Sequence, residues 1–545
     1  MNSDHLLVAA LDFGTTYSGY AFSTRSDFQK DPLIIHTNQA WNAGGRQLLS
    51  LKTPTVLLLD KNKKFVSFGY EAENQYSDLM MDKEHEDYFY FHRFKMRLHK
   101  NTHLSKASMI EDITGKSVKD IRWVLTVPAI WSDAAKQFMR KSAEKAGIPG
   151  KHLLIALEPE AASIYCQYLP TEKLNGADEG FTMADVGTKY MIVDLGGGTV
   201  DITVHEKQED GKLKELCQAT GDACGGTSVD NEFFQLLVKI VGAPLMNNLS
   251  KEDPSAYLDL FREFETVKRT IKPTQTGKMN FTIPFVALDT LCKKNFEEDF
   301  PSTVSACSLS DTISLRGDKM RAEVDILRAL YSKSLVDIVS HVASVIKECN
   351  SVSMLLLVGG FSESEMLQHA LRKEFPDKRI IIPDDAGLSV LKGAVLFGQN
   401  PDYISSRVTR YTYGLLTKEI FKHDVHDKAK LEIVDGKERC KDCFLIIKKL
   451  NEATLVGTKV TKRLFTVKKF QSVVTLAVYM SNKGNPKYTD EPGCTHIGTV
   501  EIEIANPSEG DLYFDVTFCF GNTELTVTTT EEGTEHTVTS KFDLV

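Results

Sequence analysis

The chain has 545 residues, of which 42% are hydrophobic and 26% charged, and its formal net charge is −9 at pH 7. This composition is typical of a globular protein and excludes a disordered one, and the length predicts three or four domain-sized units. The negative charge argues against a general electrostatic grip on nucleic acid or on an anionic membrane surface, so neither is expected as a partner.

No targeting or membrane-spanning segment is predicted. The apolar run Leu6–Leu11 is too short for the hydrophobic region of a signal peptide, and Asp12 interrupts it. No apolar run approaches the roughly 18 residues that a membrane-spanning helix requires. Cys440 and Cys443 have no second pair nearby to complete a four-ligand site, so a zinc or redox centre there is the weaker alternative. We expect a cytoplasmic protein whose ten cysteines are reduced thiols.

The first informative pattern is an apolar run followed by an aspartate and a turn rich in glycine and threonine. Leu6–Leu11 predicts a buried strand, Gly14-Thr15-Thr16 a turn, and Tyr17–Phe22 a second strand. Glycine has no Cβ, so backbone N–H groups in such a turn can approach a ligand and together form a nest for an anion. Asp12 lies at the end of the first strand, directly before this nest.

The same order of residues returns about 180 residues later, between Tyr190 and Val204. Two strand-like runs enclose Gly196-Gly197-Gly198, and the hydroxyl of Thr199 adds a further donor. Asp194 and Asp201 flank this turn and would repel a bare phosphate, so they imply a hard cation between acid and phosphate. Mg²⁺ suits this place because it keeps most of its waters and takes few direct protein ligands.

Two such hairpins indicate two related lobes that face each other across one nucleotide. Their spacing is too long for a solenoid, whose repeats run roughly 20 to 50 residues. Facing hairpins would hold the β- and γ-phosphates, with Asp12 and Asp194 directed at the waters of the metal. The alternative is a pair of unrelated turns with acids placed by chance.

The motifs Asp-x-Gly-Thr-Thr and Asp-Leu-Gly-Gly-Gly-Thr-x-Asp resemble those of the superfamily of actin, sugar kinases and heat-shock ATPases. More narrowly, the chain resembles the seventy-kilodalton heat-shock chaperone family, in its divergent twelve-A and twelve-B branch, over residues 5 to 400. The resemblance implies an α/β nucleotide-binding domain (residues 1–403) of two actin-like, ribonuclease-H-like lobes. Lobe I would comprise about residues 1–188 and 376–403, and lobe II about residues 189–375. ATP or ADP and Mg²⁺ are the implied cofactors, with the metal at Asp12, Asp194 and Asp201.

By the same resemblance, four residues would serve hydrolysis. Phe91–Leu98 resembles the segment that carries the catalytic lysine of chaperone ATPases, which places Lys95 where charge develops in the transition state. Glu158, in front of a proline, would order the waters of the metal. The alternatives are a lysine on a solvated helix face and an ordinary acid in the first turn of a helix, where the dipole favours it. The implied catalytic residues are Lys95, Glu158, Asp194 and Thr199.

Two further segments are expected at the nucleotide. Gly225-Gly226 precedes a predicted helix, whose free N–H groups and dipole would face a phosphate. A second helix, predicted over Asp253–Lys272, resembles the nucleoside-binding helix of the family. Its Glu265 and Lys268 would take ribose hydroxyls, and Arg269 would lie against the base. In isolation the same pattern is a salt pair on a solvated face.

The turn Gly359-Gly360 follows a buried strand and resembles the adenosine motif of the family. Glu363 replaces the arginine that closes the other side of the adenine ring, which removes a contact worth on the order of 1 kcal/mol. Lys272 is a second departure, because typical members have a small hydroxyl residue there. We therefore expect weakened adenine affinity but intact phosphate binding, with Asp385 at the N-cap of the closing helix. The residues expected at the nucleotide are Asp12, Gly14, Thr15, Thr16, Tyr17, Gly196, Gly197, Gly198, Thr199, Gly225, Gly226, Glu265, Lys268, Arg269, Gly359, Gly360 and Asp385.

Residues 404–545 show alternating strand patterns separated by turns, which predicts an all-β domain, a sandwich. The resembled family also has a β-sandwich, followed by a helical lid, but no lid is expected because the last predicted strand runs directly to Val545. Tyr403–Arg410 replaces the leucine-rich acidic linker of typical members, so ATP-controlled clamping of peptides is not implied. The domain is expected to bind protein partners. The basic segment Lys459–Phe470 fits either an anionic partner or a charged edge strand.

The leading functional hypothesis is an atypical heat-shock-type chaperone that binds ATP, hydrolyses it slowly, and uses its nucleotide state to modulate the protein interactions of the β domain. One alternative is a small-molecule, sugar-type kinase of the same superfamily, although no acid placed to deprotonate a sugar hydroxyl can be identified. The other is a scaffold that binds nucleotide without turnover. The sequence predicts no oligomeric state.

Overall fold

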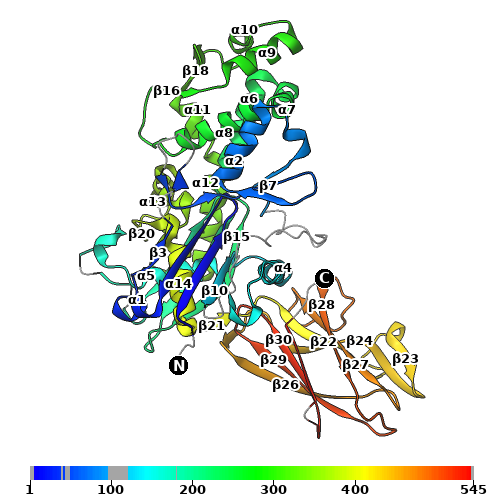
Figure 1. The fold of residues 1–545 in the computed structure, drawn as a ribbon. Coiled ribbons are helices and arrows are strands. Elements are labelled where there is room, and N and C mark those ends of the chain that lie inside the picture. Colours follow the sequence, from blue (N-terminus) through cyan, green and yellow to red (C-terminus); the bar gives the residue numbers. More distant parts are fainter. Residues whose placement is uncertain are drawn as a thin grey trace.

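The computed structural model describes residues 5–38, 41–42, 49–95, 121–179, 181–183, 185–534 and 536–541. A tall α/β body holds the N-terminal and central parts of the chain, and the C-terminal strands form a β region beside its lower end (Figure 1). This mixed α/β architecture confirms the expected class. Within the described ranges, no helix is long and apolar enough to span a membrane.

The first sheet has the strand order β11-β10-β1-β2-β3, and a short strand, β6 (Thr53–Pro54), also pairs with β2. β1 and β2 form the antiparallel hairpin of the first glycine turn, whereas β10 and β11 run parallel to β1. We call this sheet, together with β7–β9 and α2, the first lobe. Its strands are β1 (Leu7–Phe13), β2 (Tyr17–Thr24), β3 (His36–Thr37), β10 (Ile121–Val127) and β11 (Leu153–Leu157).

The second sheet repeats this order in β20-β19-β13-β14-β15 and extends it at both ends with β12 (Leu174–Asn175), β21 and β25. β13 and β14 form the antiparallel hairpin of the second glycine turn, and β19 and β20 run parallel to β13. We call this sheet, together with α6–α13, the second lobe. Its repeated strands are β13 (Lys189–Leu195), β14 (Val200–Lys207), β15 (Leu213–Asp222), β19 (Met354–Val358) and β20 (Arg379–Pro383).

Two buried helices, α5 (Glu158–Cys166) and α14 (Ser389–Gln399), pack against each other between the sheets. Their close approach depends on Gly393, because a Cβ there would overlap the backbone carbonyl of Ala161. Both helices contribute to one core with strands of both sheets, including β1, β13 and β19. The two glycine hairpins are therefore fixed relative to each other by a shared hydrophobic core.

The upper part of the first lobe is a small sheet with the order β8-β7-β9, covered by α2. Helix α2 also contacts α8 of the second lobe (Figure 1). Arg262 on α8 lies 2.8 Å from Glu73 on α2. These elements are β7 (Val56–Leu59), β8 (Phe65–Phe68), β9 (Phe89–His92), α2 (Tyr70–Met81) and α8 (Pro254–Lys268). Helix α8 ends at Lys268, with Arg269 as its C-cap residue, which is four residues before the end predicted at Lys272.

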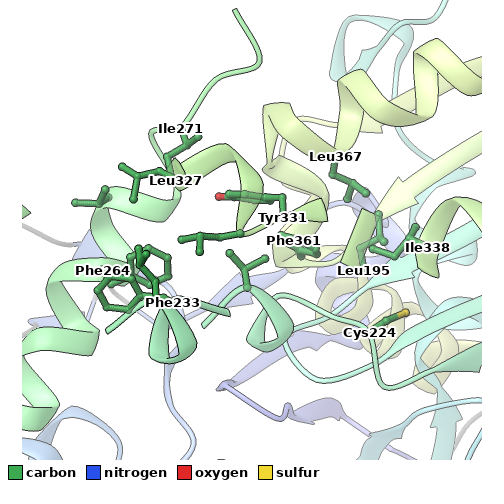
Figure 2. Packing of buried hydrophobic residues seen from close by; sticks show 14 of the residues in the cluster. Leu195, Cys224, Phe233, Phe264, Ile271, Leu327, Tyr331, Ile338, Phe361 and Leu367 are labelled. Carbon is green, nitrogen blue, oxygen red and sulfur yellow. The ribbon is translucent and has the colours of Figure 1, made fainter. Parts of the chain in front are cut away.

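The largest core lies in the second lobe and holds α6 and α8 in place. Phe233 on α6 stacks on Phe264 of α8 with ring centroids 3.8 Å apart, and Tyr331 stacks on Phe361 nearby (Figure 2). The helices of this lobe are α6 (Thr227–Val241), α7 (Ala243–Glu252), α9 (Phe285–Phe296), α10 (Phe300–Ala306), α11 (Val324–Ala329), α12 (Ser332–Glu348) and α13 (Glu365–Glu374). Its outer sheet pairs β16 (Lys278–Thr282), β18 (Lys319–Glu323) and β17 (Ile313–Arg316).

The C-terminal region contains a five-stranded sheet, β23-β24-β22-β27-β28, and a four-stranded sheet, β26-β29-β30-β31, which share one hydrophobic core. The five-stranded sheet comprises β22 (Thr412–Ile420), β23 (Leu431–Val434), β24 (Lys437–Lys448), β27 (Val473–Ser481) and β28 (Cys494–Glu503). The four-stranded sheet comprises β26 (Thr458–Phe465), β29 (Tyr513–Phe520), β30 (Thr526–Glu531) and β31 (Thr537–Lys541).

Two strands past residue 403 belong to the sheet of the second lobe instead. β21 (Ile404–Val408) pairs with β15, and β25 (Ala453–Leu455) pairs with β21. Ion pairs reinforce this junction, since Arg407 contacts Glu160 of α5. The division at residues 403 and 404 stays a prediction, and hydrogen-bonded pairing runs across it.

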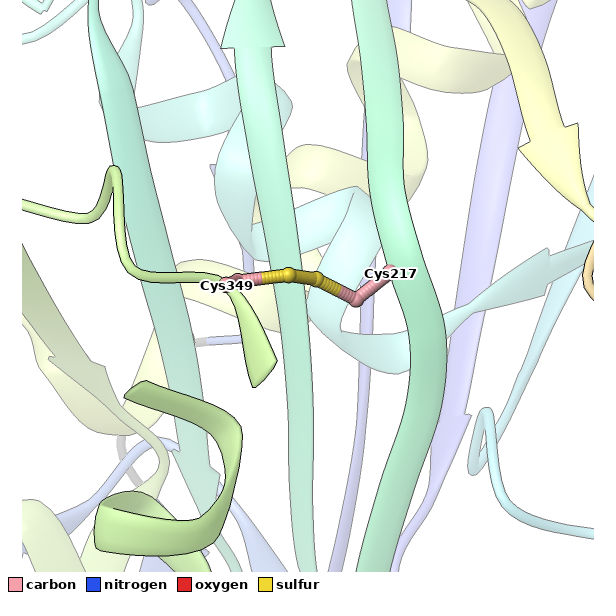
Figure 3. The surroundings of a disulfide bond; sticks show 2 residues. All are labelled: Cys217 and Cys349. Atoms are coloured by element: carbon pink, nitrogen blue, oxygen red, sulfur yellow. A yellow bond between two sulfur atoms is a disulfide. The ribbon is translucent and has the colours of Figure 1, made fainter. Parts of the chain in front are cut away.

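The expectation of ten reduced cysteines is wrong for one pair. Cys217 on β15 and Cys349, the C-cap residue of α12, form a disulfide with Cα atoms 6.8 Å apart (Figure 3). The end of α12 packs against β15 and so brings together two residues that are 132 positions apart in the chain. The other eight cysteines, including Cys440 and Cys443, are free.

Candidate functional site

The two glycine turns meet at the centre of the molecule. Asp12 and Asp194 occupy equivalent places, since each is the next-to-last residue of the first strand of its hairpin. Gly197 of the second turn lies against Thr16 of the first, because a Cβ on Gly197 would overlap the Thr16 side chain. Two segments that are about 180 residues apart in the chain therefore line one site.

The helix behind the second turn supports it. The N–H groups of Gly225, Gly226 and Thr227 donate to the carbonyl oxygens of the Gly196-Gly197-Gly198 turn over 2.7 to 3.4 Å. The expectation of free N–H groups at Gly225 and Gly226 is therefore wrong, because the turn already accepts them. Among the described residues, the amides of Gly197 and Gly198 donate no backbone hydrogen bond, so they are the donors that remain for an anion.

Buried carboxylates surround these turns. Asp12 accepts hydrogen bonds from Lys52 at 2.7 Å and from Thr126 at 2.9 Å. Asp201 accepts the backbone N–H of Ile130 at 3.0 Å. Asp194 is buried and has no ion-pair partner among the described residues. Lys52 and Thr126 were not identified from the sequence as site residues, because each reaches Asp12 from a segment that is distant in the chain.

The pKa values reflect how closely these acids lie. Burial raises the pKa of Asp12, but Lys52 and Lys95 outweigh it and hold the net pKa below its ordinary value. Burial and the charges of Glu158, Asp201 and Asp12 raise the pKa of Asp194 well above its ordinary value. An added cation would relieve this repulsion.

The donor set fits a hydrated cation. Within the described part of the chain, no three His, Cys, Asp or Glu side chains are placed to ligate one metal directly. Asp12, Asp194 and Asp201 nevertheless interact electrostatically, so they are placed to accept hydrogen bonds from the waters of a Mg²⁺ ion.

Lys95 is not the solvated lysine of the alternative hypothesis. Its side chain is 1% exposed, its Nζ lies 2.8 Å from Oε1 of Glu158, and it stands 5.2 Å from the ring centroid of Trp131. Glu158 is the first residue of α5 and is buried. Burial raises the pKa of Glu158 to about 7, although Lys95 opposes the shift. Residues 96–98 of the predicted lysine segment lie outside the described residues.

The three predicted nucleoside residues form one charged cluster. Lys268 Nζ lies 2.5 Å from Glu265 and 2.8 Å from Asp230, and Arg269 lies 2.9 Å from Glu265. Arg269 also stands over the ring of Tyr17 in the first lobe, 5.9 Å from its centroid. Lys268 is buried, so this is not a solvated salt pair. Sequence reasoning missed Asp230, whose only signal was an acid shortly after Gly225-Gly226.

Glu363 lies close to this cluster at the end of a short 3-10 helix, η4 (Gly360–Glu363). Burial lowers the pKa of Arg269, but Glu265, Tyr17 and Glu363 contribute to a net rise. Lys272 points elsewhere and pairs with the exposed Glu365 at 2.8 Å. Of these two departures from the family pattern, Glu363 is the one that interacts electrostatically with Arg269, the arginine expected at the base.

The expectation of Asp385 at the N-cap of the closing helix is wrong, because Leu388 has that position in α14. Asp385 is the N-cap residue of the short 3-10 helix η5 (Ala386–Leu388) instead, and its side chain makes no capping hydrogen bond. It accepts the hydroxyl of Tyr165 at 2.8 Å and pairs with Lys392 instead. The backbone of η5 still reaches the adenosine turn, because Gly359 N–H donates to Ala386 O at 3.0 Å. Gly359, with φ +83°, packs against Asp194, where a Cβ would meet Oδ1 at 2.5 Å.

A family model described as Hsp70 protein matches residues 101–541, which is more than half of the chain. The chain belongs to the Hsp70 family. This Hsp70-family protein is 34% identical to heat shock 70 kDa protein 12A of Homo sapiens over 627 aligned residues, which cover 99% of this chain and 92% of that protein. The Mus musculus protein of the same name matches at the same identity and coverage. Heat shock 70 kDa protein 12B of Homo sapiens is 32% identical, covering 99% of this chain and 91% of its own length.

These relatives confirm the divergent branch that the sequence motifs indicated. As an Hsp70-family member, the chain carries the actin-like ATPase domain of that family.

Proposed function

We propose that this protein binds Mg²⁺-ATP between its two glycine turns, hydrolyses it slowly, and uses the bound nucleotide to alter how its C-terminal β-sandwich meets protein partners in the cytoplasm. The observation that carries the proposal is the contact between Gly197 and Thr16. This contact brings together the two glycine turns, which are surrounded by the buried carboxyl groups of Asp12, Glu158, Asp194 and Asp201 and by the buried Lys95.

Each group has a role that its surroundings allow. The free amides of Gly197 and Gly198 bind phosphate oxygens, and the hydroxyls of Thr15 and Thr199 add donors. When bound, Mg²⁺ supplies positive charge that offsets the phosphates. Asp12, Asp194 and Asp201 hold the waters around it. The side chains of Glu265 and Lys268 bind the ribose hydroxyls, and Arg269 packs against the base.

Hydrolysis is an in-line attack of water on the γ-phosphorus, which breaks its bond to the bridging oxygen. Lys95 stabilises the charge that develops on the γ-phosphate. Glu158 holds Lys95 and, with a pKa of about 7, accepts a proton near neutral pH. Turnover is slow because Glu158 already neutralises part of the positive charge of Lys95. Less of this charge is then available to stabilise the transition state.

The β-sandwich is linked to the site through the backbone of Ile130. The N–H of Ile130 donates to Asp201, and the carbonyl of Ile130 accepts Nη1 of Arg410 at 2.6 Å. A ligand that changes the interactions of Asp201 therefore acts on the same residue whose carbonyl holds Arg410. This link supports an effect of nucleotide on the β-sandwich.

A nucleotide-binding scaffold without turnover is the second candidate. The buried ion pair of Lys95 and Glu158 favours it, because a lysine held this firmly is less available to the phosphate.

Steady-state release of phosphate separates these functions, with calorimetric binding of Mg²⁺-ATP measured alongside. We expect slow release without added substrate and a change of rate with an unfolded peptide. Binding without release would establish the scaffold, and release that depends on a sugar from a panel would establish a kinase. Absence of binding would overturn the site itself.

A further inference from the structure

Arg93 stands in a turn that a non-glycine residue adopts only at a cost. Its φ is 50°, in the left-handed region, directly after β9 and two residues before Lys95. Such a conformation persists only where the surrounding structure holds it. Here the backbone N–H of Arg93 donates to Thr55 O at 3.3 Å, and its side chain reaches the second lobe.

The partner of Arg93 is a buried acid of the second lobe. Nη2 of Arg93 lies 2.8 Å from Oδ2 of Asp230, which is 4% exposed, and Lys268 Nζ lies 2.8 Å from the other oxygen. Oδ2 of Asp230 accepts no hydrogen bond within the described part of the chain, so its contact with the Arg93 guanidinium is an ion pair. Removal of Arg93 would leave Lys268 as the one cation that these contacts give the buried Asp230 carboxylate, which is unfavourable.

Asp230 is itself linked to the phosphate turn. It lies in the first turn of α6, the helix whose Gly225, Gly226 and Thr227 amides hold the second glycine turn. The Arg93 turn therefore connects two parts of the site. On one side it is anchored to the helix that supports the phosphate nest, and on the other it leads directly to Lys95.

We propose that Arg93 is a positioning residue, which pairs with Asp230 of the second lobe and thereby holds Lys95 against Trp131 and Glu158. The inference rests on the proposed function for the role of Lys95 in hydrolysis. In this role Arg93 acts on Lys95 through the turn that precedes it. Lys95 is then aligned only when the two lobes meet.

Trp131 reports the position of Lys95 without any nucleotide. The Lys95 ammonium stands 5.2 Å from the indole centroid, and indole emission responds to a nearby charge. The chain has three tryptophans, so Trp41→Phe together with Trp123→Phe leaves Trp131 as the only reporter. In this background, Lys95→Met gives the emission of an indole without its cation.

The test compares three further variants in the same background. Arg93→Gln should shift the Trp131 emission most of the way to that of Lys95→Met, and Arg93→Lys should restore much of the original emission. Arg262→Gln, which breaks a different ion pair between the lobes, with Glu73, should leave the emission unchanged. Single-turnover hydrolysis should fall about tenfold to a hundredfold in Arg93→Gln, as expected for a misplaced catalytic group.

Each outcome decides the inference. An unshifted Arg93→Gln spectrum beside a shifted Lys95→Met spectrum overturns it, and so does an Arg262→Gln shift as large as that of Arg93→Gln. An unshifted Lys95→Met spectrum overturns it as well, because Lys95 then does not lie on the indole. If the Trp131 emission of Arg93→Gln shifts fully but the parent protein hydrolyses no ATP, the positioning role of Arg93 is supported and the proposed hydrolysis is overturned. The two hypotheses can therefore fail independently.

Discussion

Gly197 lies directly against Thr16, so that the second glycine turn has no room for a side chain where it meets the first. Gly197→Val should therefore abolish binding of Mg²⁺-ATP, because the new side chain fills the space between the turns. Calorimetric titration with Mg²⁺-ATP measures this. Gly484→Ala is the matched control, since its Cβ would meet only Leu450 at 3.8 Å, and it should bind as the parent does. Full affinity in Gly197→Val would show that nucleotide does not bind between these turns.

Asp194→Ala should also abolish binding of Mg²⁺-nucleotide while leaving the fold intact. The substitution removes an anchor for the waters of the metal, and it also removes a carboxyl whose burial is unfavourable for folding. Calorimetry with and without Mg²⁺, together with thermal unfolding, separates the two effects. A variant that binds Mg²⁺-ATP as tightly as the parent would contradict the role of Asp194.

Lys95→Ala should retain nucleotide and lose most of the turnover, because its charge acts chiefly in the transition state. Single-turnover hydrolysis at saturating ATP is the measurement. Lys61→Ala, which removes an exposed lysine of the same lobe, should leave turnover unchanged. Equal turnover in Lys95→Ala and the parent would leave the buried lysine with a structural role only.

Glu363→Arg should tighten binding of ATP by about tenfold, the value of one good stack at roughly 1 to 1.5 kcal/mol. Glu363 acts on Arg269, the arginine expected against the base, so an arginine in its place can close the other face of adenine. Affinity for tripolyphosphate, which has no base, should stay level. If tripolyphosphate tightens equally, or ATP weakens, Glu363 does not face the base.

The stability of the protein should depend on pH through Glu215, which lies at the junction with the β region. Glu215 accepts the N–H of Val408 at 2.7 Å. Burial and then the charge of Glu160 raise the pKa of Glu215 to about 8. The folded state therefore binds more protons than the unfolded chain between the ordinary carboxyl pKa and this value. The contribution of Glu215 to stability is full at acidic pH and is lost as the pH rises through about 8.

Glu215→Gln removes this dependence, because the amide cannot ionise yet still accepts a hydrogen bond. The free energy of unfolding of the variant, relative to the parent, should grow with pH by up to about 1.4 kcal/mol per pH unit. Urea unfolding at about pH 5.5, 7 and 8.5 measures the difference. Glu509→Gln, at an exposed ion pair, should show no such trend. A constant difference between Glu215→Gln and the parent would refute the raised pKa.

The parts of the fold and site that lie in short segments were predictable from sequence. Both glycine hairpins are local patterns of apolar periodicity, glycine and acid, and the structure contains strands at each of them. The Hsp70 family followed from the same residues.

The rest depends on contacts between distant segments. Lys52, Thr126 and Asp230 each gain their role from a partner far away in the chain, which the local sequence around them does not show. The amides of Gly225 and Gly226 looked free because their acceptors lie in another hairpin. The disulfide of Cys217 and Cys349 depends on how α12 packs against β15, which spacing does not encode.

The pairing of β21 with β15 bears on how an isolated nucleotide-binding fragment has to be cut. A fragment that stops at residue 403 loses β21 and with it β25, and the flank of β15 becomes a bare sheet edge. Unpaired edges recruit strands from other molecules, so such a fragment should aggregate. β25 lies between β24 and β26, deep within the C-terminal half of the sequence, so no single truncation point retains the complete second sheet without also keeping β22 to β24.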